Sequence, residues 1–249
     1  MLLAVDIGNS SIKFGVFDGE SLTTKFSIPT RRNYSASEIA NKVDHQMPTS
    51  IDAAIVCSVV PEVDNAIAKF INDAFQIEPR FARSADDLGL SINFSVATTG
   101  ADRLVNSFSA AEKYGLPCIV VSFGTATTID VVSAKKEYLG GLIAPGIKVS
   151  AEALALAASK LAAVEITKPS NVIAQTTVDA IRSGIVNGHI AMVEGLLKQI
   201  IEQLNGNLKI VATGGFAGLL ASEIEQIEVV DEDLTLNGLS ALYKRHHSK

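Results

Sequence analysis

The stretch Cys118-Ile-Val-Val-Ser-Phe-Gly-Thr-Ala-Thr-Thr-Ile-Asp130 decides how the rest of this chain is interpreted. It opens with a short apolar run that has the length of a buried strand. Gly124 breaks this run, and a second β-rich run starts at Ile129. Between them stand three hydroxyl side chains, those of Thr125, Thr127 and Thr128. The residues predict strand, tight turn, strand. The turn fits two uses, either an ordinary threonine-rich hairpin or a cradle of amides and hydroxyls for phosphate oxygens.

The same pattern occurs near the N-terminus, where an apolar run leads into Asp6-Ile-Gly-Asn-Ser-Ser-Ile-Lys13 and then into another strand-like run. Placing Gly8 on Gly124 aligns the two stretches. The alignment sets Asp6 on Ser122, Ser11 on Thr127 and Ile12 on Thr128. Such an internal repeat favours a nucleotide held between two halves, with one turn on each side of the phosphates. Two coincidental hairpins remain the alternative.

The pattern of apolar and turn residues predicts two β-β-β-α-β-α halves with mixed sheets, residues 1–115 and 116–249. Expected strands are 2–5, 14–17, 22–28, 51–60, 79–82, 119–121, 129–132, 138–143, 208–212 and 227–230. In the first half, helices are expected from Ser35 or Ser37 to about residue 45, over 62–74, and from Gly100 to about 115. In the second half, they are expected from Gly146 to about 163, over 177–204, from the end of the Thr213-Gly-Gly215 motif to about 222, and from about 237 onward. Residues 86–99 are expected to be irregular. The glycines at 184, 188 and 195 are expected to allow close packing of the long helix or to kink it.

Composition restricts the classes of function. Of the 249 residues 47% are hydrophobic, which suffices for a core, and the net charge is −6 without the basic run typical of nucleic-acid binding. The basic cluster at 244–247 is interpreted as a solvated tail. Cys57 and Cys118 stand in apolar runs and are expected to be buried free thiols of a reducing compartment. Because Asp6 interrupts the first apolar run and no run reaches membrane-spanning length, we expect a cytoplasmic protein without a membrane partner.

Several of these residues suit phosphoryl transfer, which needs positioning and charge neutralisation more than covalent chemistry. Asp6 offers a carboxylate of the kind that holds Mg²⁺. The amides and polar side chains of Gly8, Asn9 and Ser10 suit phosphate oxygens. Lys13 either adds positive charge to the phosphates or is a solvated strand residue, and the residues alone do not decide between these.

A second candidate group lies at the start of the helix that follows Gly100. Asp102 there is placed to accept a proton from an attacking hydroxyl, and Arg103 to grip an anionic acceptor. The alternative is an ordinary carboxylate at a helix N-terminus beside a surface arginine. Thr213-Gly-Gly215 either lets the backbone pass an adenine ring or is a plain loop before a helix. The sequence contains no metal-ligand cluster, Ser/His/Asp set or Walker-type loop, and no histidine receives a role.

Taken together, the motifs give the whole chain a resemblance to the type III pantothenate kinases. This family belongs to the actin-like, sugar-kinase-like ATPase superfamily, whose halves are ribonuclease-H-like. The motifs that carry the resemblance are Asp6-Ile-Gly-Asn-Ser-Ser-Ile-Lys13, Ser58-Val-Val-Pro61, Gly100-Ala-Asp-Arg103, Gly124-Thr-Ala-Thr-Thr128, Gly140-Gly-Leu-Ile-Ala-Pro-Gly146, Thr177 with Ser183-Gly-Ile185, and Thr213-Gly-Gly215.

The resemblance implies ATP-dependent phosphorylation of pantothenate to 4'-phosphopantothenate, the first step towards coenzyme A, with Asp102 as general base. It further implies that the family's homodimer interface helps to form the pantothenate site, and that the cofactors are Mg²⁺ and a monovalent cation, K⁺ or NH₄⁺. The residues it assigns to pantothenate are Gly100, Ala101, Asp102, Arg103 and Thr177. The residues it assigns to ATP and its metal are Asp6, Ile7, Gly8, Asn9, Ser10, Ser11, Ile12, Lys13 and Thr125.

The chain departs from the family pattern at three places. Ser122 stands where the family's second turn begins with an aspartate that is associated with the monovalent cation. Gln175 stands where a lysine or arginine usually precedes Thr177, and residues 93–99 lack the usual proline. Three hypotheses therefore stay open: an active pantothenate kinase with altered cation dependence, a weakened paralogue that binds nucleotide and regulates, or a related kinase with another hydroxylated acceptor.

Overall fold

A computed structural model describes the chain except for residues 84–88, 94–98, 159–160, 205, 207 and 248–249. The chain forms two compact units, one of residues 1–113 with 233–249 and one of residues 114–232. The division expected from the sequence left residues 233–249 in the second half, whereas the structure packs them with the first unit. Most of the segment expected to be irregular, 86–99, lies outside the described residues.

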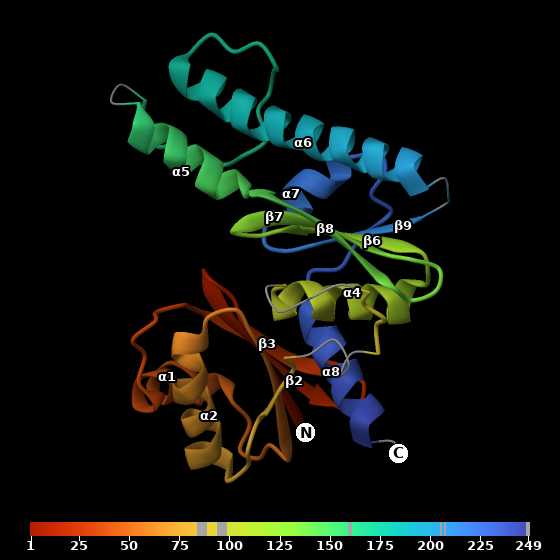
Figure 1. The fold of residues 1–249 in the computed structure, drawn as a ribbon. Helices are drawn as coiled ribbons and strands as arrows, with labels where there is room; N and C mark the ends of the chain where they lie inside the picture. The colour runs from red at the N-terminus through yellow and green to blue at the C-terminus, as the bar shows by residue number, and fades with distance from the viewer. Residues whose placement is uncertain (84–88, 94–98, 159–160, 205, 207, 248–249) are drawn as a thin grey trace. The chain divides into compact units, whose positions relative to one another are not determined.

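The first unit is built on a mixed sheet with the strand order β3-β2-β1-β4-β5. Its strands are β1 (Leu2–Ile7), β2 (Ser11–Asp18), β3 (Ser21–Pro29), β4 (Ala53–Ser58) and β5 (Arg80–Phe81). The central strand β1 is antiparallel to β2 and parallel to β4. Every second side chain of β1 is buried against α1 (Ala36–Val43) and α2 (Pro61–Phe75). In Figure 1, α1 and α2 cover one face of this sheet and α8 (Leu234–His247) covers the other.

Local sequence signals set the ends of the first helices. Ser35, rather than Ser37, caps α1 in a capping box with Glu38. Pro61 occupies the first turn of α2, and Gln76 ends that helix in the left-handed conformation. The residues Val63, Ile67, Phe70 and Ile71 are buried at helical spacing and form the packed face of α2.

The second unit repeats the plan of the first. Its sheet has the order β10-β9-β6-β7-β8, the same as the first when the strands are counted within each unit. The strands are β6 (Cys118–Phe123), β7 (Ala126–Val132), β8 (Tyr138–Pro145), β9 (Lys209–Thr213) and β10 (Val229–Val230). Its core lies between alternate side chains of β6 and the helices α6 (Thr177–Leu204) and α7 (Ala217–Leu220). The predicted duplicated α/β fold is confirmed.

Three details differ from the sequence prediction. The helix α5 (Ile147–Ala157) ends six residues before position 163, because alanine and leucine favour a helix but Leu156 is 90% exposed and finds no packing surface. The helix α8 begins at Leu234 rather than near 237, because Leu234 and Leu236 are buried and join its packed face. Glycines 184, 188 and 195 neither break α6 nor mark close packing, since a Cβ at each would meet no described atom within 4 Å.

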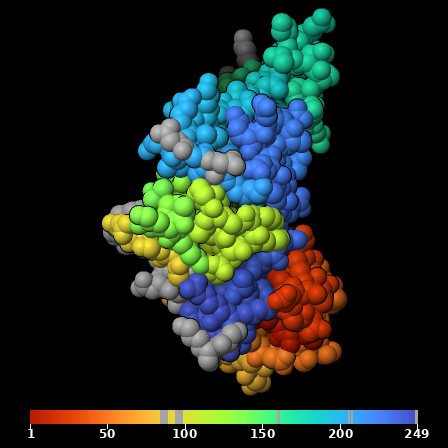
Figure 2. All heavy atoms as spheres, turned by 90° about the vertical axis from the view of Figure 1, so that its right-hand side faces the viewer, coloured from red at the N-terminus to blue at the C-terminus, as the bar shows by residue number. Residues whose placement is uncertain are grey.

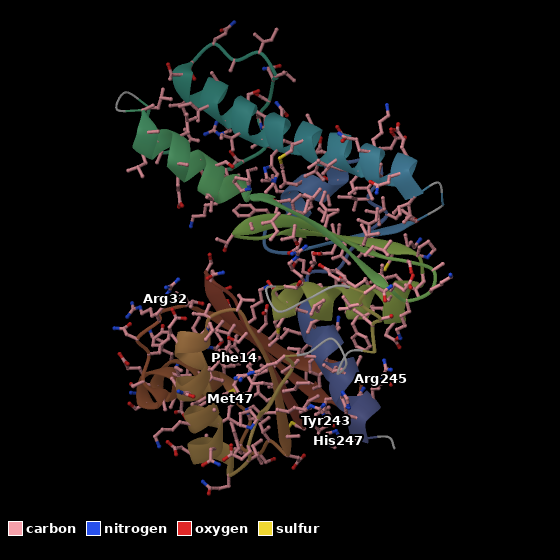
Figure 3. All side chains as sticks on the ribbon, viewed as in Figure 1. Phe14, Arg32, Met47, Tyr243, Arg245 and His247 are labelled. Carbon is pink, nitrogen blue, oxygen red and sulfur yellow. The ribbon has the colours of Figure 1, made fainter. Side chains whose placement is uncertain are left out.

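The basic cluster at 244–247 forms the last turn of α8, where positive side chains suit the helix dipole. Its side chains are half-buried or exposed, so the expected contact with solvent is present, but the segment is helical. Figure 3 labels Tyr243, Arg245 and His247 on this helix, and the rings of Tyr243 and His247 stack with centroids 4.0 Å apart. Figure 2 shows α8, in deep blue, lying against the red first strands of the same unit.

Other expectations concern isolated groups. Cys57 and Cys118 are buried free thiols, as expected. Within the described ranges, no helix is both long and apolar enough to cross a membrane. The same residues contain no group of three His, Cys, Asp or Glu side chains arranged to hold a metal ion.

Candidate functional site

The first predicted turn joins β1 to β2 in the first unit. Ile7 pairs with Ile12 across the two strands, and the Gly8 amide donates to the Ser11 carbonyl at 3.0 Å. The loop tip between them consists of Asn9 and Ser10, both exposed. Glycine, asparagine and serine tolerate the backbone of such a tight turn. The predicted strand, turn, strand arrangement is confirmed here.

The second turn joins β6 to β7 in the second unit and is one residue shorter. Phe123 pairs with Thr127, and the Gly124 amide donates to the Ala126 carbonyl at 3.1 Å. Thr125 stands exposed at its tip. When the strand pairings of the two units are superposed, Asp6 matches Ser122, as expected. Because the second turn is one residue shorter, each residue after Gly124 matches a residue one position later in the first unit than the sequence alignment gave. The structure therefore aligns Ile12 with Thr127 and Lys13 with Thr128, so the sequence alignment of Ser11 with Thr127 was wrong.

Two of the three threonines of the second turn are used inside the protein. The Thr127 hydroxyl lies 2.8 Å from His189 Nε2 of α6, and the Thr128 hydroxyl donates to Asp130 at 3.2 Å. Burial lowers the pKa of His189, which favours its neutral form. No role was expected for His189 from the sequence, although its spacing from Val186 and Val193 places it on the buried face of α6. Thr125 is the threonine left at the tip.

Glycines from two distant motifs hold the second turn in place. The Gly146 amide donates to the Thr125 carbonyl at 3.1 Å, and a Cβ at Gly146 would collide with the Gly124 carbonyl. Gly214 has φ of +95°, and a Cβ there would lie 2.6 Å from the Phe123 carbonyl oxygen. For Gly124, by contrast, the nearest atom to a Cβ is 3.5 Å away, an ordinary contact. Packing therefore explains Gly146 and Gly214, whereas the glycine of the turn itself leaves room for an approaching ligand.

Asp6 is a buried carboxylate at the end of β1. It stands opposite Lys13 on β2 and beside Cys57 on β4. Burial raises its pKa from 3.8 to about 6, the charge of Lys13 opposes this rise, and Asp102 adds to it. Lys13 thus acts on Asp6 from the same face of the sheet. The neighbouring Cys57 thiol, its pKa raised by burial and then by Asp6 and Asp102, stays protonated.

Asp102 lies in the first turn of α4 (Ala101–Tyr114), in the same unit as Asp6. Its Oδ1 accepts the Arg103 amide at 2.8 Å, while Gly100 supplies the carbonyl that accepts the same amide at 3.1 Å. A Cβ at Gly100 would lie 2.5 Å from Asp102 Oδ1, so a larger residue there would require this carboxylate to turn away. The Gly-Ala-Asp-Arg motif therefore has a local structural role, because it positions the Asp102 carboxylate at the start of α4.

Thr177 begins α6 in the second unit, and both Thr177 and Gln175 are exposed. The helix is capped by Thr176, whose hydroxyl accepts the Asp179 amide at 3.1 Å. Of the expected site residues, 6–13 and 100–103 belong to the first unit, and Ser122, Thr125 and Thr177 to the second.

The second unit also contains an open cavity of about 390 Å³ beside Phe216, directly after the Thr213-Gly-Gly215 motif. It lies between α5, which contributes Lys148 and Glu152, and the segment 163–166. Its size falls within the range of small-molecule sites, and its walls are mostly apolar with a few charged groups. This cavity was not foreseen in the sequence, because segment 163–166 was expected to follow a longer helix.

A model of the type III pantothenate kinase family matches residues 2–199. The chain belongs to this family. Its similarity extends over the full length of curated relatives: a type III pantothenate kinase from Roseiflexus sp. (strain RS-1) is 40% identical over 255 residues, all of both chains. Another, from Halalkalibacterium halodurans, is 39% identical and covers 99% of this chain and 100% of its own. The fold resembles that of a ROK hexokinase from Thermus thermophilus, with a TM-score of 0.51 and 13% identity over 98% of this chain and 99% of that one. The resemblance read from the motifs is confirmed.

The electrostatics of Asp6 predict a stability cost at neutral pH. Unfolded aspartate loses its proton near pH 3.8 and folded Asp6 near 6, so the folded state binds more protons between these values and loses stability as pH rises. Asp6→Asn removes this penalty. In metal-free buffer it should raise the free energy of unfolding by about 3 kcal/mol at pH 8 and by about half as much at pH 5. Urea unfolding at both pH values measures this, and a gain that is equal at both would contradict it.

The packing of the glycine pair after β9 predicts opposite outcomes for two neighbouring substitutions. Gly214→Ala puts a methyl group against the Phe123 carbonyl at positive φ, so we expect a loss of about 2 kcal/mol and weakened ATP binding. Gly215→Ala is the matched control for stability, because a Cβ there meets no described atom within 4 Å. Thermal unfolding and nucleotide titration of both variants measure the difference. Equal behaviour of the two would refute the packing role of Gly214.

Proposed function

We propose that this chain transfers the γ-phosphoryl group of ATP to the primary hydroxyl of pantothenate, with Asp102 as the general base. Membership of the family supports the reaction, and the position of Asp102 at the start of α4 supports its role as the general base. The Gly100 backbone leaves room for the carboxylate, and the Arg103 amide fixes one of its oxygens. We assign the Asp102 carboxylate to the substrate hydroxyl, whose proton it accepts as the phosphoryl group arrives. Arg103 binds the carboxylate of pantothenate, and Gly100, Ala101 and Thr177 contact the rest of the substrate.

ATP is proposed to bind along the two turns. In the first, residues 6–13 supply amides, hydroxyls and the Lys13 charge, and in the second Thr125 supplies a hydroxyl. Asp6 fits a role with Mg²⁺, since a nearby divalent cation favours the ionised form that burial disfavours. When bound, the metal ion neutralises the developing charge on the phosphates. The adenine is proposed to occupy the cavity beside Phe216, where an aromatic ring and apolar walls suit a planar base.

The monovalent cation is proposed to be dispensable in this chain. Ser122, at the position matched with Asp6, is half-buried and uncharged, and its neighbour across the strand pair is Thr128. A neutral hydroxyl compensates the charge of K⁺ or NH₄⁺ far less than a carboxylate does. Turnover measured with and without potassium tests this, and an absolute requirement for the ion would contradict it.

A homodimer is proposed from exposed apolar side chains of α5, α6 and the segment before α6 in the second unit. Leu156 is 90% exposed and Ile173 is 89% exposed, and Val172 and Val178 are exposed near them in sequence. Figure 1 draws α5 and the start of α6 side by side at this end of the unit. Soluble chains rarely expose several large aliphatic groups together unless a partner covers them. A second copy of this chain is the partner that the family's assembly suggests.

The general-base role predicts a sharp effect of Asp102→Asn. The asparagine oxygen still accepts the Arg103 amide but cannot take a proton, so kcat should fall at least about a hundredfold while the affinity for ATP stays within twofold. The coupled release of ADP with pantothenate measures turnover, and calorimetry measures ATP binding. Asp73→Asn, on the surface of α2, is the matched control.

Two results would separate the alternatives. If Asp102→Asn keeps most of its turnover, Asp102 is not the base. If the folded wild-type chain binds ATP but phosphorylates neither pantothenate nor other hydroxylated acceptors under any cation condition, the weakened paralogue is the correct hypothesis.

The dimer predicts that a charge among these exposed apolar side chains separates the subunits. Ile173→Glu should convert dimer to monomer in sedimentation experiments and raise KM for pantothenate, because burying a carboxylate in an apolar interface is costly. Val230→Glu, a change at another exposed valine of the same unit, serves as the control. A wild-type chain that sediments as a monomer would end the proposal.

A further inference from the structure

The carbonyl groups around the first turn are held by hydrogen bonds from neighbouring segments of the same unit. The Ile7 carbonyl accepts the Val59 amide at 3.0 Å, and the Ser11 carbonyl accepts the Gly8 amide at 3.0 Å. The Gly8 and Ser10 carbonyls are both held by one residue, Thr30. Its hydroxyl donates to Gly8 at 2.6 Å and its amide to Ser10 at 3.1 Å.

Thr30 is placed there by the end of β3. Pro29 is the last residue of that strand and pairs with Ser11, so the next residue reaches the turn from the side. Pro29 has no amide hydrogen and cannot donate to the turn, so the amide that donates to the turn from the end of β3 is that of Thr30. The side chain is half-buried, so its hydrogen bond to Gly8 competes only partly with water.

The second unit contains the same backbone arrangement without the side chain. Pro145 ends β8 and pairs with Ala126, and the following residue, Gly146, donates its amide to the Thr125 carbonyl at 3.1 Å. A Cβ at Gly146 would collide with the turn. The duplicated units therefore share the amide bond from the residue after the strand-ending proline, and only the first unit adds a hydroxyl to a second carbonyl.

The direction of these bonds matters for an anion. A peptide carbonyl oxygen carries partial negative charge and repels phosphate, whereas amide N–H groups attract it. Holding the carbonyls of Gly8 and Ser10 towards β3 fixes the orientation of the peptide planes at the tip of the turn. The amides of such a turn are then presented in one fixed arrangement, which is the condition for strong electrostatic stabilisation.

We infer that Thr30 is a positioning residue for ATP, which acts by fixing the peptide planes of the first phosphate-binding turn. The inference rests on the proposed function of that turn. It adds a residue outside the motif of residues 6–13, and it assigns the effect to the nucleotide and not to pantothenate.

The test compares Thr30→Val, which loses the hydroxyl but keeps the shape and the amide, with Thr30→Ser, which keeps the hydroxyl. Thr23→Val is the matched control, because the Thr23 hydroxyl of β3 donates to the Val16 carbonyl of β2 at 3.0 Å, away from the turn. Leaving the Gly8 carbonyl without its partner should weaken ATP binding about tenfold in Thr30→Val. Thr30→Ser and Thr23→Val should stay within twofold of wild type, and KM for pantothenate should be unchanged in all three.

Calorimetric titration with MgATP and steady-state kinetics provide the two readouts, with urea unfolding as the check on folding. If Thr30→Val does not fold, Thr30→Ala removes the same hydroxyl without a branched side chain. Equal ATP affinity in Thr30→Val and wild type overturns the inference, as does an equal loss in Thr23→Val or an equal rise in both KM values. A wild-type chain that binds ATP without phosphorylating pantothenate would refute the proposed function, yet the titrations would still decide the role of Thr30.

Discussion

The constraint on which this structure depends is the antiparallel pairing of the first two strands in each unit, flanked by a parallel strand. In the first unit β1 pairs with β2 on one side and β4 on the other, and in the second β6 pairs with β7 and β9. This arrangement leaves a tight turn at the end of a buried central strand. Because the neighbouring strand ends stop beside that turn, their next residues can bind its carbonyls. In the second unit, Gly146 and Gly214 also pack around that turn, although they are distant from it in the sequence.

Much of this was predictable because the signals are local. Apolar runs of strand length, the Ser35 cap and the glycine-hydroxyl turns each report on a few consecutive residues, and the structure has the corresponding elements. The duplication was also readable, since it repeats a local pattern. The family followed from several such motifs in a fixed order, and the comparison over the full chain confirmed it.

What the sequence did not reveal depends on contacts between distant segments. The turn lengths differ by one residue, and only strand register shows that Lys13 matches Thr128. Thr30 stands 22 positions from Gly8, and His189 stands 62 positions from Thr127, so no local pattern links either pair. The end of α5 was missed for a related reason, because helix propensity says nothing about whether Leu156 has a surface to pack against.

The two turns differ in charge, although each joins an antiparallel pair of strands. In the first, the matched pair at the strand ends is Asp6 and Lys13, and burial holds that carboxylate at a pKa of about 6. In the second, the equivalent pair is Ser122 and Thr128, both uncharged, and Thr128 is already bonded to Asp130. A buried carboxylate lowers the stability of the fold when no opposite charge compensates it. Buried carboxylates are therefore found mainly at positions where function requires the charge. At these matched positions the first unit carries a carboxylate and an ammonium group, and the second carries two hydroxyl groups. An aspartate at position 122 would lack the neighbouring positive charge that Lys13 gives Asp6, because Thr128 stands in the place of that lysine.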